Sequence, residues 1–378
     1  MSRSRLRVAL CTDGVFPQAL GGMQRHSRLL AEHLARFPEI ELHVLHPHEG
    51  SIFDARFGIH EVNIVPMDTE RFYLGELYRY SERIASALDA LQPDIVFAQG
   101  FCLWKGMERF SDRAIVHPHG LEMFQGLTWK DKAIGLPFRL LLRWVVRRSA
   151  VTVSLGGKLT SVLQQLTKGS PSQVVVLPNA AELPAVPPSY PMDVVPINLL
   201  FVGRFAFNKG IDVLVEVARN LDARADAPRF RFVLAGDGPE RARWEREGLP
   251  STVDIAGRVD DARLEELYSA CHALVLPTRF EGMPTVVLEA MARSRPAFVS
   301  DVGAAAELVD AGNGYLLPPG DADALEQALL RFAALSNRER AALGAAGRQR
   351  AAEHFTWEKV SGRFVELFRS AAARQASA

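Results

Sequence analysis

The sequence has few of the residues that mark an extracellular or a nucleic-acid-binding protein. Only three cysteines occur among 378 residues, Cys11, Cys102 and Cys271, and no CxxC pair is present. They predict reduced thiols, and they exclude a disulfide framework and a cysteine-based zinc site. Lysine and arginine number 44, as do aspartate and glutamate, so no bulk charge points to nucleic acid.

Long apolar runs are missing as well. No uninterrupted apolar stretch approaches the roughly 20 residues that a membrane span needs. The basic N-terminus leads into an apolar run that Thr12 and Asp13 interrupt, which predicts a first strand and not a signal peptide. We therefore expect a cytoplasmic protein, for which any membrane contact is peripheral.

What the sequence does contain is a regular alternation of short apolar runs with helical patterns. The runs are LRVALCT, LHVLH, DIVFAQ, AIVHPH and VTVSL in the first half, and INLLFVGR, RFVLAGDG, VDIAGR, ALVLPT and AFVSD in the second. Strands that alternate with crossover helices form parallel, doubly wound sheets. Because a single core rarely grows past about 250–300 residues, the length predicts two domains with a cleft between them.

A proline-rich segment separates the two halves and predicts a semi-rigid linker over residues 183–195. We expect one Rossmann-like domain over residues 1–182 and a second over residues 196–355. An amphipathic pattern over residues 356–378 predicts a last helix that packs back toward the first domain. In open parallel sheets ligands bind beyond the carboxyl ends of the strands, so the loops there are the places to search.

Two of these loops are rich in glycine. Gly21 and Gly22 precede a helical pattern, where a bare backbone can approach an anion and the helix N-terminus supplies free N–H groups. The spacing is not GxGxxG, which counts against a dinucleotide, and a plain loop is the alternative. Gly236, Asp237 and Gly238 predict a tight turn that is either structural or bare enough to admit a base or phosphate.

Two further loops carry groups that can hold or protonate a ligand. Gly203 and Arg204 leave a strand and Lys209 enters a helix, so a planar guanidinium and a compact ammonium can converge on a diphosphate without a metal. Ordinary surface charges are the alternative. His117 and His119 follow a strand of the first half, and His119 is the better candidate to donate to a leaving oxygen or a sugar hydroxyl near neutral pH.

A pair of glutamates, Glu281 and Glu289, flanks a turn inside otherwise apolar sequence. The turn consists of Gly282, Met283 and Pro284. Pro284 suits the first position of a helix, which leaves Glu281 in the loop and Glu289 about a turn and a half inside. The plain alternative is a loop carboxylate facing water and a surface ion pair between Glu289 and Arg293.

Two charged patterns remain. Asp321 and Asp323 have the D-x-D spacing that can hold a divalent metal, but they begin a helical pattern, so we predict a helix cap and no metal site. Arg139, Arg143 and Arg147 recur every four residues and predict a basic amphipathic helix over the segment 137–148. Such a helix either rests on an anionic bilayer or packs its apolar side inward and solvates its arginines.

In their order along the chain, these motifs resemble those of the retaining glycosyltransferases of family 4, which have the GT-B fold. The resemblance covers nearly the whole chain. It rests on Gly21-Gly22, His119-Gly120, the GR…NKG loop, AGDGP and the E-x7-E pair in FEGMPTVVLEAMA. It implies an α/β protein with two Rossmann-like, doubly wound parallel-sheet domains that face a central cleft, the first binding the acceptor and the second the nucleotide-sugar donor.

The resemblance also implies a role for each site residue. Glu289 accepts hydrogen bonds from the ribose, Glu281 orients the transferred sugar, Arg204 and Lys209 bind the diphosphate, and His119 contacts the sugar. The implied catalytic set is Glu281, His119, Arg204 and Lys209. The implied donor-binding set adds Gly21, Gly22, Gly203, Gly236, Asp237, Gly238, Gly282, Met283, Pro284 and Glu289.

The activity that follows is transfer of a sugar from a nucleotide-diphosphate sugar to a hydroxyl of a glycan or lipid-linked acceptor. The resemblance implies retention and no metal or other cofactor, in polysaccharide, lipopolysaccharide or glycolipid assembly at the inner face of the cytoplasmic membrane. A nucleotide-sugar epimerase or hydrolase, which needs no acceptor, is the alternative, and a non-catalytic binding protein is a third. Ala180 and Ala304 depart from the family, which has glycine at both positions.

Overall fold

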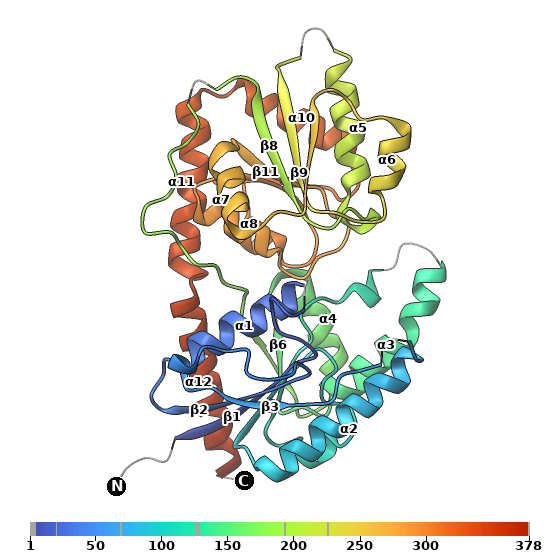
Figure 1. The fold of residues 1–378 in the computed structure, drawn as a ribbon, viewed down its shortest axis with the longest axis vertical. Helices are drawn as coiled ribbons and strands as arrows, with labels where there is room; N and C mark the ends of the chain where they lie inside the picture. The colour runs from blue at the N-terminus through green and yellow to red at the C-terminus, as the bar shows by residue number, and fades with distance from the viewer. Residues whose placement is uncertain are drawn as a thin grey trace. The chain divides into compact units, whose positions relative to one another are not determined.

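The chain forms two compact units in the computed structural model, one of residues 1–179 with 357–378 and one of residues 180–356 (Figure 1). The structure describes residues 5–19, 21–68, 70–125, 129–192, 194–224 and 227–376. Each unit contains one parallel sheet with helices on both faces, which confirms the predicted fold class.

The sheet of the first unit has seven parallel strands in the order β3-β2-β1-β4-β5-β6-β7. Successive strands are added on one side of β1 up to β3, and from β4 on they are added on the other side. The strands are β1 (Leu6–Cys11), β2 (Ile40–His46), β3 (His60–Asn63), β4 (Ile95–Gln99), β5 (Ala114–His117), β6 (Val151–Ser154) and β7 (Gln173–Val176). The apolar runs predicted every strand here except β3 and β7. Both are short, partly exposed edge strands; β3 has no continuous apolar run, whereas β7 carries the run VVVL at residues 174–177, which the sequence analysis did not include.

Helices cover both faces of this sheet. They are α1 (Gly22–Leu34), α2 (Tyr73–Leu91), α3 (Trp129–Val146), α4 (Gly157–Thr167) and α12 (Trp357–Ala376), with 3-10 turns at η1 (Ala55–Phe57), η2 (Met107–Phe110) and η3 (Glu122–Phe124). Phe97 of β4 packs against Phe364 and Phe368 of α12, whereas its neighbours Val96 and Ala98 join the core formed with α2 and α3. In Figure 1, α1 and α12 lie side by side in this unit.

The sheet of the second unit has six parallel strands in the order β10-β9-β8-β11-β12-β13, so the direction in which successive strands are added reverses between β8 and β11. The strands are β8 (Ile197–Val202), β9 (Phe230–Ala235), β10 (Val253–Gly257), β11 (Ala273–Leu276), β12 (Ala297–Ser300) and β13 (Gly314–Leu317). In such a sheet the point of reversal opens a crevice at the carboxyl ends of the strands. The loops after β8 and β11 therefore flank the expected ligand edge of this unit.

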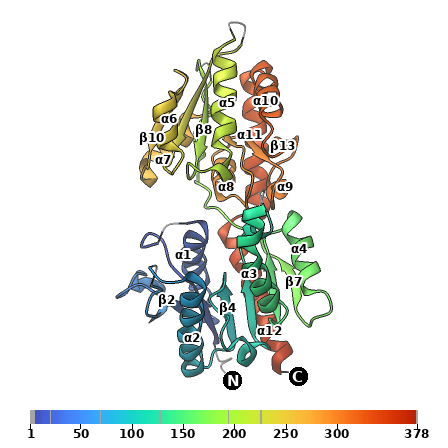
Figure 2. The same ribbon diagram turned by 90° about the vertical axis from the view of Figure 1, so that its right-hand side faces the viewer.

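The helices of this unit are α5 (Ile211–Asp222), α6 (Arg241–Glu247), α7 (Asp261–Ala270), α8 (Thr285–Ala292), α9 (Ala305–Leu308), α10 (Ala322–Ala334) and α11 (Asn337–His354), with the 3-10 turn η4 (Phe207–Lys209). Figure 2 shows α5 beside α10, and α8 packs against α11. Asp321 caps α10, because its Oδ1 accepts the N–H of Ala324 at 2.8 Å. The predicted capping role of the D-x-D segment is thus confirmed.

A buried arginine fixes the proline-rich segment to the second unit. Arg295 is fully buried and donates to the carbonyl oxygen of Ser189 at 2.7 Å, and to those of Tyr268 and Ser269 at 2.9 Å each. Its guanidinium also lies 5.4 Å from the ring centroid of Tyr190. Backbone carbonyls thereby satisfy a buried charge, and the linker is docked at this point.

Two composition-based expectations can be compared with the structure directly. The three cysteines are free and buried, which confirms that they form no disulfide framework. Among the helices of the described residues, none has both the length and the apolar character needed to cross a membrane.

Candidate functional site

The predicted site residues lie in the loops that follow the carboxyl ends of strands, or in the helix that begins directly after such a loop. Gly21 and Gly22 come after β1, and His119 comes after β5 in the same sheet. In the second unit, Gly203 to Lys209 follow β8, Gly236 to Gly238 follow β9, and Glu281 to Pro284 follow β11. The second unit therefore gathers most of the predicted donor-binding residues along one edge of its sheet.

The contact that best defines this edge is an ion pair between Lys209 and Glu281. Their loops are 72 residues apart in the chain, yet the Lys209 ammonium donates to the Glu281 carboxylate. Both side chains are partly buried, with 24% and 14% exposed, so water does not fully screen the pair. The structure thus places together two residues that the sequence analysis assigned to one ligand.

The turn that carries Lys209 is packed closely against the loop after β11. Gly210 ends this turn with a φ of 67°, a conformation that favours glycine. A Cβ added to Gly210 would lie 1.7 Å from the carbonyl oxygen of Pro277, which no side chain can tolerate. Glycine at this position is therefore a requirement of the contact between the two loops.

Arg204 differs from Lys209 in its surroundings. Its side chain is exposed, and its guanidinium makes no hydrogen bond or ion pair with any other residue in the part of the chain that the structure describes. It leaves the same strand, β8, whose loop carries Lys209. A guanidinium without a protein partner at the ligand edge of the sheet is available to bind an anion.

The glycines after β8 and β9 allow these two loops to touch. A Cβ on Gly236 would lie 1.9 Å from the carbonyl oxygen of Gly203, and one on Gly238 would lie 2.3 Å from that of Phe205. Asp237 accepts the N–H of Gly238 at 2.8 Å, so its carboxylate shapes the turn. The structural interpretation of this turn holds, and its contact with a ligand stays a prediction.

The E-x7-E segment differs from its prediction by one residue. Pro284 is the N-cap of α8, with φ −71° and ψ 110°, and not the first helical residue. The helix begins at Thr285, which places Glu289 a little over one turn inside it. Proline suits either position, because its missing N–H costs nothing before the first turn, and the sequence alone does not distinguish the two.

The loop between the two glutamates is held by its neighbour after β12. The N–H of Ala304 donates to the carbonyl oxygen of Gly282 at 2.8 Å. Gly303, with φ 55°, approaches so closely that an added Cβ would lie 2.3 Å from the carbonyl oxygens of both Glu281 and Gly282. Ala304 itself is fully buried, so its departure from the family's glycine is accommodated in this loop.

Glu289 lies in a different environment from the one a surface ion pair would give it. Its carboxylate accepts the hydroxyl of the buried Tyr268 at 3.0 Å. Arg293 instead donates to the carboxylate of Glu265 at 2.6 Å and to the main-chain carbonyl of Glu289 at 2.9 Å. Burial and the neighbouring Glu289 raise the pKa of Tyr268 well above its ordinary value, so its hydroxyl remains a donor. Tyr268 carried no sequence signal.

His119 is held in a left-handed backbone conformation, with φ 60°. Its Nε2 lies 2.8 Å from Oε1 of Gln99, a residue that the sequence analysis missed, and its ring centroid is 3.8 Å from that of His117. Burial, and then the nearby rings of His117 and His26, hold the pKa of His119 well below its ordinary value. The ring is therefore held neutral, in which form one nitrogen donates and the other accepts, and its predicted contact with a sugar hydroxyl stays a prediction.

Within the described ranges of the chain, His26, His117 and His119 form a group of ligand-type side chains close enough to hold a metal ion. Their nearest ring nitrogens lie within 4.8 Å of one another. Imidazoles bound to one ion at about 2.1 Å keep their ring centroids roughly 5 Å apart. The ring centroids of His117 and His119 lie 3.8 Å apart with the ring planes inclined by 37°, which is closer than two imidazoles on one ion and is the distance of ring packing.

The glycine pair of the first unit begins α1. Gly21 is the N-cap and Gly22 the first helical residue, and no side chain caps this end. Both are exposed, and a Cβ added to Gly22 would meet nothing within 4 Å. The free N–H groups of the first turn are thus accessible, as the predicted anion contact requires.

Family models match most of the chain in two blocks. One described as Glycosyltransferase Family 4 matches residues 20–183, and one described as Glycosyl transferases group 1 matches residues 196–334. The chain belongs to the group 1/family 4 glycosyltransferases. Each block covers most of one Rossmann-like unit, and together they contain every residue of the site described above.

Relatives of this family match to different extents. An uncharacterized glycosyltransferase of Methanocaldococcus jannaschii is 32% identical over 165 residues, which are 42% of this chain and 44% of that protein. The chain thus spans less than half the length of this relative. Alpha-maltose-1-phosphate synthase of Mycolicibacterium smegmatis is 25% identical over 97% of this chain and 100% of that protein.

Solved structures share the GT-B fold with this chain. Sucrose-phosphate synthase from Thermosynechococcus elongatus superposes with a TM-score of 0.80 at 20% identity, over 98% of this chain and 100% of that one. HepE of Anabaena, solved in complex with UDP-glucose, has a TM-score of 0.72 at 16% identity, over 97% and 100% of the two chains. At this level of identity the likeness shows the fold alone.

The basic stripe predicted for this glycosyltransferase is wrong in detail. Arg139 donates to the carbonyl oxygen of Met123, and Arg147 lies just beyond α3 and donates to those of Leu166 and Lys168. Of the three arginines only Arg143 is exposed. The periodicity identified the helix, but it gave no sign that backbone carbonyls engage two of the charges.

The exposed side chains at residues 129–140 of α3 are instead mostly apolar or lysine, with one acidic residue, Asp131. Large apolar side chains are exposed there by 52–75%, namely Trp129, Ile134, Leu136 and Leu140. Lys130 and Lys132 are exposed among them. An exposed patch of this composition is uncommon on a monomer that has no partner for it.

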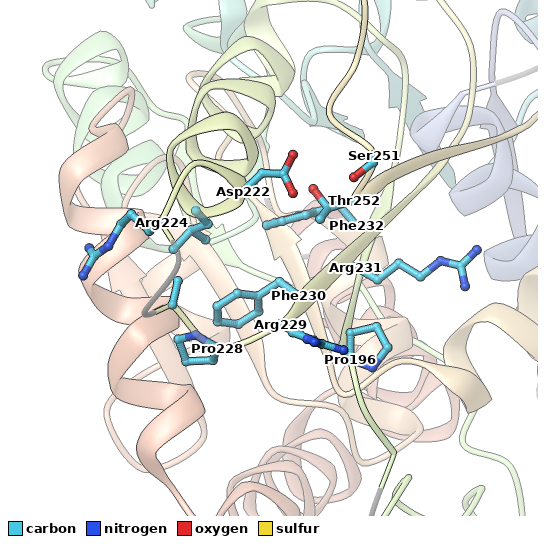
Figure 3. Close-up of a pocket in the computed structure, with 12 residues that line it drawn as sticks. Pro196, Asp222, Arg224, Pro228, Arg229, Phe230, Arg231, Phe232, Ser251 and Thr252 are labelled. Atoms are coloured by element: carbon cyan, nitrogen blue, oxygen red, sulfur yellow. The ribbon is translucent and has the colours of Figure 1, made fainter.

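A cavity of about 470 Å³ lies in the second unit, but away from the site (Figure 3). Pro196, Arg229 and Phe230 line it at the amino ends of β8 and β9, and Asp222 and Arg224 line it from the end of α5. In a parallel sheet these are the opposite ends from those that bind ligands. This cavity therefore does not belong to the candidate donor site.

Proposed function

We propose that this glycosyltransferase moves a sugar, with retention of configuration, from a nucleotide-diphosphate sugar to an acceptor hydroxyl. The observation that carries the proposal is the pairing of Lys209 with Glu281 at the ligand edge of the second unit, where the loop of Lys209 also carries Arg204, whose guanidinium has no partner among the described residues. Two cations on a loop at this edge can bind a diphosphate. Glu281, in the loop before the helix that carries Glu289, can bind the sugar, so the arrangement suits a nucleotide-diphosphate-sugar donor.

The residues divide the work by charge. When the donor's glycosidic bond breaks, negative charge accumulates on the departing diphosphate, and Arg204 and Lys209 stabilise it. Glu281 then exchanges its partner Lys209 for hydroxyls of the transferred sugar, and Glu289 accepts hydrogen bonds from the ribose. The leaving phosphate removes the acceptor proton, so no protein base is needed on that face. His119, neutral at working pH, contacts the sugar.

The family match supports an acceptor that is a glycan or a lipid-linked glycan. The free N–H groups of α1 and the ring of His119 lie on the unit that we assign to the acceptor side. Because two protein cations serve the diphosphate, we infer that neither a metal nor another cofactor is required. Among relatives by fold, HepE binds UDP-glucose, which makes a UDP-sugar the first donor to test.

A panel of UDP-, GDP- and ADP-sugars tests this function in buffer with EDTA. We expect one donor class to release nucleoside diphosphate at an undiminished rate with the chelator, because Arg204 and Lys209 replace the metal. Release should require an acceptor glycan. Activity that EDTA abolishes and Mg²⁺ or Mn²⁺ restores would contradict the metal-free mechanism, and release of free or epimerised sugar without acceptor would identify the hydrolase or epimerase.

We also propose that the protein works at the inner face of the cytoplasmic membrane and meets it through α3. The exposed apolar side chains of α3 can enter the interface between headgroups and acyl chains. Lys130 and Lys132 outweigh the exposed Asp131 by one positive charge, which attracts anionic lipid at about 1 kcal/mol. This surface replaces the arginine stripe of residues 137–148. It also fits a lipid-linked acceptor, whose sugar lies at the same interface.

Sedimentation with anionic vesicles tests this contact. We expect the double variant Leu136→Gln, Leu140→Gln to lose at least tenfold in vesicle binding, because two exposed apolar side chains on one face of α3 no longer enter the interface. The matched control changes two exposed valines elsewhere, Val65→Gln and Val186→Gln, and should bind as the wild type does. Equal recovery of all three proteins in the supernatant would show that α3 is only a solvated face.

A further inference from the structure

Arg279 links the turn that carries Lys209 to the loop that carries Glu281, and no motif pointed to it. Its guanidinium donates to both carboxylate oxygens of Asp212, at 2.7 and 2.8 Å, and to the carbonyl oxygen of Phe207 at 2.8 Å. It also lies 4.0 Å from the ring centroid of Phe207. Its side chain is only 13% exposed, so this set of contacts is largely shielded from water.

The backbone around Arg279 grips the same turn. Its N–H donates to the carbonyl oxygen of Asn208 at 2.8 Å, and the hydroxyl of Thr278 donates to that oxygen at 2.9 Å. Gly210 packs on Pro277 so closely that it admits no side chain. Three of the four residues from Phe207 to Gly210 are therefore held by the segment just before Glu281, and Lys209 is the one whose side chain extends to Glu281 itself.

The pair with Asp212 matters for charge as well as for shape. Asp212 stands in the first turn of α5, directly after the Lys209 turn, and its side chain is 29% exposed. Without Arg279 this carboxylate would be an unpaired negative charge next to the loop that receives the diphosphate. A planar guanidinium satisfies both oxygens at once, which a lysine ammonium cannot do in the same geometry.

We propose that Arg279 is a positioning residue of the donor site. It fixes the turn from Phe207 to Gly210 against the loop after β11, and it neutralises Asp212, so that the Lys209 ammonium meets the diphosphate in one defined place. Arg279 itself does not touch the donor. The inference rests on the proposed function of Lys209 and adds to it the group through which that lysine is held.

Steady-state kinetics of Arg279→Met and Arg279→Lys test the proposal on the donor that the panel identifies. We expect both variants to lose about tenfold to a hundredfold in kcat/KM for the donor, with KM for the acceptor unchanged. The Arg279→Lys variant should not recover activity, because an ammonium cannot bind both oxygens of Asp212 and the carbonyl of Phe207 as the planar guanidinium does. The matched control is Arg231→Met, which breaks another arginine–aspartate pair of the same unit, with Asp254, and should stay within twofold of the wild type.

A double variant separates positioning from a general loss of stability. If Arg279 acts through Lys209, then Arg279→Met should cost little further activity in a Lys209→Ala background, whereas independent effects would multiply. Multiplicative losses, or wild-type kinetics in both Arg279 variants, would overturn the proposal. Should Arg279→Met melt early, Arg279→Lys carries the same comparison. A wild type that turns over no donor of the panel would refute the proposed function itself, and this inference with it.

Discussion

Lys209→Ala and Arg204→Ala should each lower kcat by about 10²–10³ while the protein stays folded. The reason is that each removes a cation aimed at the diphosphate, and groups that stabilise charge developing in a transition state have effects of this size. The two variants should differ in stability. Arg204 has no protein partner in the described part of the chain, whereas removing Lys209 leaves the partly buried Glu281 without its counter-ion.

Rates, donor titrations and melting temperatures of purified variants check this result. The control is Arg243→Ala, because the Arg243 side chain is 55% exposed and pairs with Glu240 and Glu247, so its loss should leave kcat unchanged. A fall in donor affinity with an unchanged kcat would mean that the cations bind the ground state and the transition state equally. Wild-type kinetics in both variants would exclude these residues from the site.

Local patterns predicted those parts of the fold that depend on local chemistry. Continuous apolar runs identified the central strands, since a parallel strand buried on both faces needs apolar residues on both. The strands β3, β7 and β13 were missed, because β3 has no continuous apolar run and the apolar runs of β7 and β13 are short. Glycines after strands marked the loops correctly, because a close approach such as that of Gly210 to Pro277 excludes every side chain and so restricts the sequence.

The residues that the sequence did not reveal are those whose partners lie far along the chain. Arg279 meets Asp212 across 67 residues, and Arg295 meets Ser189 across 106. An arginine in a loop looks the same whether it faces water or several carbonyl oxygens, so only the folded chain tells the two apart. The same limit explains why Arg139 and Arg147 were expected on a surface stripe although backbone carbonyls engage them.

Glu289→Gln should weaken donor binding by about 1–3 kcal/mol and change kcat little. Hydrogen bonds from the ribose to a charged carboxylate contribute this much to the free energy of donor binding. The kcat is spared because the ribose does not change during transfer. The hydroxyl of Tyr268 holds the Glu289 side chain, so Tyr268→Phe should produce a smaller loss of the same kind. A merely solvated glutamate would instead cost a few tenths of a kcal/mol in stability and nothing in donor affinity.

Glu281→Gln should differ in kind, because this carboxylate acts beside the reacting carbon. We expect kcat to fall about tenfold to a hundredfold, more than donor affinity does, since the lost hydrogen bonds to a charged group are strongest as the sugar becomes cationic. The variant also releases Lys209 from its ion pair, which frees the ammonium for the diphosphate and should hold donor affinity near the wild-type value. If both glutamate variants lost donor affinity equally while kcat stayed at the wild-type value, Glu281 would contact the nucleotide and not the transferred sugar, which would contradict its proposed role.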